Sequence, residues 1–177
     1  MTYDLEERLE DAFVSYLKTK VSGSVKIFAS FMYSHSYPCA VVHVGSSSSL
    51  VPDSQWRDPR ALSGAISVQT QYASSLNDNA QVIEGARERH AAARASIMAA
   101  LAVPDAEATP DGLSGFVQTE DMPTGLAARL CAMLTPGIFI KFAAIGEMER
   151  SVDDERALLI SVIPFRCIAQ SIEIGGV

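Results

Sequence analysis

The stretch Ala65–Leu101, AISVQTQYASSLNDNAQVIEGARERHAAARASIMAAL, decides the fold. Its first part, Ala65–Tyr72, alternates between two kinds of side chain, and a period of two residues predicts a half-buried strand. Turn and N-cap residues follow at Ser74–Asn79. Beyond them, a stripe at steps of three and four predicts an amphipathic helix that lies across a sheet. The stripe consists of Ile83, Ala86, His90, Ala93, Ile97 and Leu101.

The segments on either side of this stretch supply a second helix and the sheet. Near the N-terminus an apolar stripe runs from Leu5 to Leu17, and we expect acidic residues such as Glu10 on the outward face of that helix. The next two apolar segments are joined by a short polar connection, which predicts a hairpin. The last strand is apolar on both faces, which is typical of a covered central strand, and Pro164 marks a bulge or an edge in it.

The fold class that follows is α+β, with residues 1–177 forming a single domain. We predict a mixed, mainly antiparallel sheet of about five strands packed against two helices. The expected strands are 25–33, 39–44, 65–72, 137–148 and 155–171. The expected helices are 4–20 and 79–101, with a short third helix at 124–134.

Two segments do not fit this alternation of strands and helices. Gly45–Gly64 contains four consecutive serines and two prolines, which predicts a long loop. Trp56, the only tryptophan, lies in that loop and either folds back on the domain or anchors a partner. Val103–Pro136 is rich in acids and prolines, and we expect it to be an acidic insertion of the same domain, because it is too short for a core of its own.

Charge and composition exclude several classes of protein. The net charge is −7, which disfavours free, non-specific binding to nucleic acid but allows a lumen through which DNA passes. We find no signal peptide and no apolar run of about 20 residues, so we expect no membrane association. Three widely separated cysteines are expected to be core thiols in a reducing compartment, so the protein is cytoplasmic or assembled in a cytoplasm.

Residues that carry chemistry do not gather into a recognisable motif. The three histidines are not at metal-ligand spacing, and the chain has no nucleophile elbow, phosphate-binding loop or dinucleotide fingerprint. We therefore expect no catalytic residue, no cofactor and no metal. His90 is interpreted as a hydrogen-bonded core histidine. The alternative is a small enzyme or ligand-binding domain with a pocket near His90, Tyr72 and Cys167.

The order of elements resembles the tail-terminator (tail-completion) proteins of long-tailed bacteriophages. The resemblance is carried by the N-terminal helix, the strands that follow it, the strand that leads into the long helix, and the closing strand. These are Leu5–Leu17, Val25–Met32, Cys39–Val44, Ile66–Tyr72 running into Asn79–Leu101, and Leu158–Ala169. The likeness spans most of the chain and is one of architecture, because such proteins have no catalytic motif to match.

The resemblance implies a structural virion protein of the tail, assembled in the host cytoplasm. Such proteins form homo-oligomeric rings, with hexamers expected, that cap the tail tube protein, stop its polymerisation and present a surface to the head-side neck or connector protein. Other head–tail joining or tube-like components, and bacterial adaptor or secretion-assembly proteins, are the alternatives. The interface candidates are Trp56, Arg57, Arg60, Asp153 and Asp154.

Overall fold

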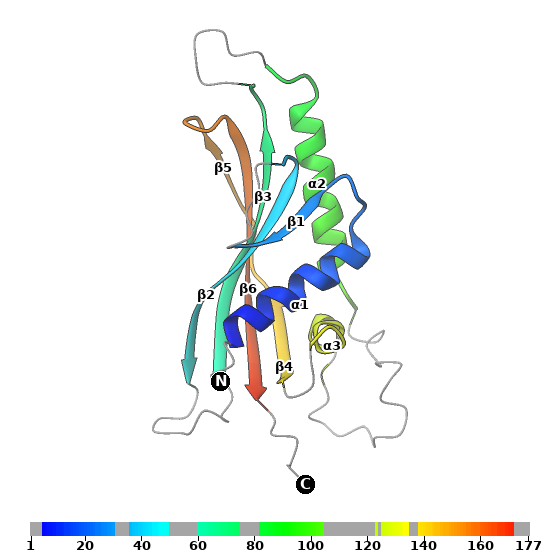
Figure 1. The fold of residues 1–177 in the computed structure, drawn as a ribbon, viewed down its shortest axis with the longest axis vertical. Coiled ribbons are helices and arrows are strands. Elements are labelled where there is room, and N and C mark those ends of the chain that lie inside the picture. Colours follow the sequence, from blue (N-terminus) through cyan, green and yellow to red (C-terminus); the bar gives the residue numbers. More distant parts are fainter. Residues whose placement is uncertain are drawn as a thin grey trace.

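A computed structural model describes most of the chain as three helices and six strands (Figure 1). It describes residues 5–30, 36–49, 60–74, 82–104, 123, 125–134 and 138–171. The helices are α1 (Leu5–Lys20), α2 (Ala86–Leu101) and α3 (Gly125–Cys131). The strands are β1 (Lys26–Ala29), β2 (Cys39–Ser49), β3 (Arg60–Gln71), β4 (Ile138–Ile145), β5 (Glu149–Asp153) and β6 (Leu158–Ser171).

The strands form one mixed sheet in the order β1-β2-β3-β6-β4, with β5 also paired to β6. Only β1 and β2 are parallel, and the other pairs are antiparallel. The predicted α+β class is therefore confirmed, with one strand more than expected and with the short third helix in place. That the whole of 1–177 forms one domain stays a prediction, because part of the chain lies outside the described residues.

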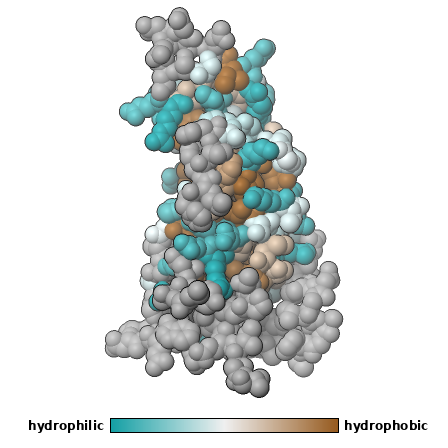
Figure 2. Space-filling model, in the orientation of Figure 1, coloured by the Kyte–Doolittle hydropathy of each residue, from teal (hydrophilic) through white to brown (hydrophobic). Residues whose placement is uncertain are grey.

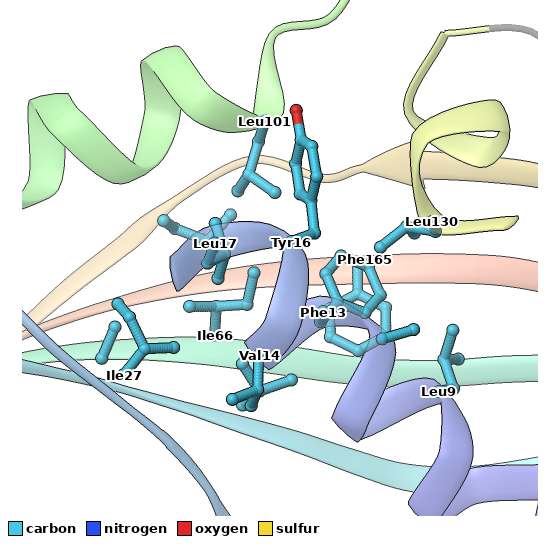
Figure 3. Packing of buried hydrophobic residues seen from close by; sticks show 14 of the residues in the cluster. Leu9, Phe13, Val14, Tyr16, Leu17, Ile27, Ile66, Leu101, Leu130 and Phe165 are labelled. Carbon is cyan, nitrogen blue, oxygen red and sulfur yellow. The ribbon is translucent and has the colours of Figure 1, made fainter. Parts of the chain in front are cut away.

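The hydrophobic core lies between the sheet and the helices. From α1, Phe13 stacks against Phe165 of the central strand β6, with ring centroids 4.4 Å apart (Figure 3). The Tyr16 hydroxyl donates a hydrogen bond of 2.7 Å to the Ala100 carbonyl, which ties α1 to the end of α2. Buried apolar residues of all three helices and of the sheet belong to the same cluster.

Gly64 makes room for this core on β3. A Cβ at that position would lie 2.5 Å from Cζ of Phe165 and 2.2 Å from the His43 carbonyl oxygen. Any side chain there would force the Phe165 ring and the β2 backbone to shift. The glycine therefore leaves room on β3 for the Phe165 ring, which meets Phe13.

The hairpin predicted for the first two strands is wrong. Strands β1 and β2 pair in parallel, with Lys26 opposite Cys39 and Ala29 opposite Val42. Alternation of apolar and polar residues tells which face of a strand is buried but not which way the strand runs, so the pattern fits both arrangements. The expected strand 25–33 also extends past the observed end of β1 into residues 31–33, which lie outside the described residues.

The long loop predicted for Gly45–Gly64 is also wrong in part. Strand β2 continues to Ser49 and β3 begins at Arg60, and the two pair from Ser46 opposite Ser63 to Ser49 opposite Arg60, after a bulge near Gly45. Backbone hydrogen bonding to a neighbouring strand thus outweighs the weak strand propensity of a serine run. Residues 50–59 lie outside the described residues.

Other boundaries differ for local reasons. Helix α2 begins at Ala86, not at residue 79, because Gly85 has a left-handed backbone (φ 68°) that a helix cannot pass through. The residues between the expected strands 137–148 and 155–171 are mostly strand β5, paired with β6. Pro164 lies where the pairing of β6 changes from β5 to β4, so its missing N–H costs no ladder bond, and its carbonyl accepts from the Gly146 N–H at 2.7 Å.

Candidate functional site

The helices all pack on one face of the sheet. None of the described helices covers the other face. Helix α1 contacts the core through Phe13, and α2 contacts β3 and β6 through His90. Seen from the helix side, hydrophilic residues cover much of the described surface around an apolar area near the middle (Figure 2). We name the opposite surface the open face.

The open face is made of alternate residues of the same strands. On β3 these residues are small or polar and half-buried: Ala61, Ser63, Ala65, Ser67, Gln69 and Gln71. On β6 they include Val162 and Ile168, which are half-buried, and Arg166, which is exposed. Phe142 of β4 pairs with Ile168 on this face and keeps 50% of its surface exposed.

A shallow hollow of about 420 Å³ lies at the end of the open face toward Phe142. Its lining includes Ser48 of β2, Ala61 of β3, Phe142 of β4, and Arg166 and Ile168 of β6. Among the described residues that line it, Arg166 alone is charged. The hollow is therefore an apolar surface with a single positive charge, a composition typical of protein contacts.

The other end of the sheet carries an acidic tip, which we define as Glu147–Arg156. It contains five acids against two arginines, Arg150 and Arg156. Asp153 accepts a hydrogen bond of 3.0 Å from the Arg156 N–H, and Asp154 accepts one of 2.9 Å from the Tyr72 hydroxyl. At this tip Val152 is 56% exposed.

The structure separates the interface candidates from one another. Arg60 pairs with Ala169 of β6, whereas Asp153 pairs with Leu158. At about 3.3 Å per residue, these positions are about 36 Å apart along β6. Arg60 therefore cannot meet Asp153 or its neighbour Asp154 within one chain, and Trp56 and Arg57 lie outside the described residues.

The alternative pocket around His90 does not form from the three residues proposed for it. His90 is 8% exposed, and its ring nitrogens lie 3.1 Å from Oγ1 of Thr70 and 2.9 Å from Oγ of Ser161. Cys167 lies six positions along β6 from Ser161, about 20 Å away. The expected hydrogen-bonded core histidine is confirmed.

Burial governs the titration of these groups. Burial, with Arg94 and Arg150 nearby, lowers the pKa of His90 below its usual value. Burial raises the pKa of the Cys167 thiol to about 12 and that of Cys39 to about 11. Thiols with such pKa values stay protonated near neutral pH and are poor nucleophiles.

Sequence patterns missed a buried carboxylate at the edge of the sheet. Glu10 of α1, expected on the outward face, is 4% exposed and accepts a hydrogen bond of 2.9 Å from the Val44 N–H and one of 3.0 Å from the Ser30 hydroxyl. Its Oε1 also lies 3.5 Å from Nδ1 of His43. Glu10 thus accepts a hydrogen bond from the edge of β2 beyond the end of β1. Only the tertiary arrangement reveals that role.

Within the described ranges, no group of three or more potential metal ligands comes together. None of the helices described is long and apolar enough to cross a membrane. Inside the same part of the chain, every buried side-chain nitrogen and oxygen has a hydrogen-bond partner. The arrangement as a whole is that of an α+β protein whose distinguishing surface is the open face with its hollow and acidic tip.

No protein-family model and no curated protein matches the sequence. Among the solved structures that match is a chain described as "Virion of native gene transfer agent (GTA) particle". It is 10% identical, with a TM-score of 0.40, over 94% of this chain and 95% of that chain. A likeness at this level is too low to carry a conclusion about what this chain does.

Proposed function

We propose that this chain is a structural virion protein that caps the tail tube of a long-tailed phage as a tail terminator. The observation that carries the proposal is the open face, where one side of a six-stranded sheet has no cover from the described helices. Antiparallel sheets often leave one face to solvent, but the exposed Phe142 beside Ile168 gives this face an apolar area of the kind that contacts another protein chain. The sequence resemblance to tail terminators names the kind of assembly.

The proposed role is mechanical and involves no catalysis. Copies of the chain would form a closed ring, with a hexamer expected, on the last ring of the tail tube protein, stop its growth and present a surface to the neck or connector protein. DNA would meet the ring only by passing through its lumen. The interface candidates keep their proposed place in this ring, since Arg60 and the acids Asp153 and Asp154 lie at opposite ends of one chain.

A related head–tail joining or tube-like component is the runner-up within the same class. The enzyme alternative receives no support from His90, because both ring nitrogens are engaged by buried hydroxyls and the side chain is almost fully enclosed. A ligand would have to displace these partners before it could reach the ring.

Electron microscopy of phage tails tests the proposal. Tails assembled without this chain should be abnormally long and fail to join heads, and supplying the chain should restore uniform length and joining. If tails lack joining but have normal length, the head–tail joining role replaces the terminator role. Tails of normal length that join heads without the chain would disprove both.

A further inference from the structure

The hollow on the open face lacks a partner within the described chain. Phe142 exposes half of its surface and lines the hollow together with Ile168, so the apolar surface there is contiguous, and contiguous apolar surface marks a contact more than a single exposed residue does. Arg166 is exposed at the same place, and no described acid forms an ion pair with it. A complementary partner for the hollow is therefore partly apolar and negatively charged.

The acidic tip has these two properties. Val152 presents an apolar side chain that is 56% exposed. Around it the tip has three more acids than arginines, counted as five minus two over Glu147–Arg156. Four of the acids are exposed, and two of these, Asp154 and Glu155, lie beside Val152 at the far end of the tip.

The far end of the acidic tip, Val152–Glu155, cannot meet the hollow of the same chain, whereas Glu149 pairs with Val162, only four positions from Arg166, and is left out of the contact. Arg166 lies eight positions along β6 from Leu158, the residue that pairs with Asp153. That spacing corresponds to about 26 Å along the strand. A side chain spans a small fraction of this distance, so the two surfaces can contact each other only between two molecules.

We propose that the acidic tip of one copy of this chain docks into the hollow of a second copy, with the carboxylates of Asp154 and Glu155 beside Arg166 and Val152 against Phe142. The contact is heterologous, because it joins two different surfaces, and such contacts build rings when the rotation between copies closes. The inference rests on the proposed ring and names one contact within it. It concerns self-association alone, so it can fail while the role in tails stands.

Charge reversal on each side tests the contact. Sedimentation velocity and light scattering of the full chain should show concentration-dependent association that weakens as salt is added. Arg166→Glu should raise the dissociation constant at least tenfold. Replacement of Asp154 and Glu155 by lysine should do the same, and the chain that carries all three changes should regain association.

A matched control separates this contact from a general effect of charge. Lys141→Glu makes the same change of charge on β4, at an exposed residue that does not line the hollow, and it should leave association within about twofold of the wild type. Circular dichroism of each variant shows whether the fold is kept. Regained association in the threefold variant could not come from a misfolded chain.

Three results would overturn the inference: a wild-type chain that stays monomeric at millimolar concentration, charge variants that associate like the wild type, or equal losses from Arg166→Glu and Lys141→Glu. Each of them leaves the proposed function standing if tails made without the chain are still defective. Normal tails without the chain would instead remove the proposed function, whatever the charge variants do.

Discussion

The two faces of the sheet are built from the same strands but do different work. On β6, Ile163, Phe165 and Cys167 face the helices and are at most 1% exposed. Their neighbours Val162 and Arg166 face the other way and are half-buried or exposed. The difference teaches that alternate residues of one strand can carry separate tasks: one set stabilises the monomer, and the other is free to serve an assembly.

The largest expected difference between the two faces of the sheet lies at Phe165. Phe165→Ala should lower the free energy of unfolding by about 3–5 kcal/mol, because it empties the place beside Phe13 and leaves a cavity in the core. Urea unfolding followed by circular dichroism measures the change. A loss below about 1 kcal/mol would show that the helix face is not the main source of stability.

The edge of the helix face is tested at Glu10. Glu10→Ala should cost about 1–3 kcal/mol, because the Val44 N–H and the Ser30 hydroxyl lose their acceptor in a buried place. Glu7→Ala is the matched control on the same helix, and since Glu7 is exposed the change should stay within about 0.5 kcal/mol. Equal effects of the two substitutions would mean that Glu10 does not hold the edge of β2.

Much of the helix face could be predicted from the sequence. The period of two residues in β3 and the steps of three and four in α2 identified the side chains that are buried, including His90, Ile97 and Leu101. The direction of β1 could not be predicted, because alternation reads the same in both directions. Glu10 was missed because helix periodicity predicts that a carboxylate outside the apolar stripe is exposed. The periodicity carries no information on the neighbouring edge of β2, whose unpaired N–H groups need an acceptor.

The candidate site was predicted less well. The sequence offered basic and acidic interface residues, Arg60 among the first and Asp153 and Asp154 among the second, but not that they lie at opposite ends of β6. It did not single out Phe142 or Arg166 either, because their partners on the open face come from strands distant in sequence. Long-range pairing of strands decides which of these residues become neighbours.

His90, on the helix face, should make the stability of the fold depend on pH. Because burial and two arginines lower its pKa in the folded state, the unfolded state binds the proton more readily. The contribution of His90 to stability is therefore complete above the unfolded pKa of about 6.5, is lost as the pH falls below it, and levels off below the lowered folded-state pKa.

The measurement is urea unfolding between about pH 5 and pH 8 for the wild type and for His90→Gln. The variant should lose about 1 kcal/mol at pH 8, because it keeps one of two hydrogen bonds. The difference between the two proteins should shrink toward acid pH, since only the wild type carries the histidine. A difference that grows toward acid pH would mean that the folded state favours the charged ring.

The smallest change in stability is expected at Phe142, which forms a matched pair with Phe165. Both are phenylalanines on adjacent strands, but Phe142 lies on the open face and is 50% exposed, against 1% for Phe165. Full burial of such a side chain contributes about 1.5–3 kcal/mol, so Phe142→Ala should cost the monomer no more than about 1 kcal/mol. Its larger effect should appear in self-association, where the apolar part of the hollow is lost. Urea unfolding at a concentration that keeps the chain monomeric isolates the first effect, and sedimentation velocity measures the second. If Phe142→Ala destabilised the monomer as much as Phe165→Ala, both faces would be core, and the open face could not be a surface kept for another copy.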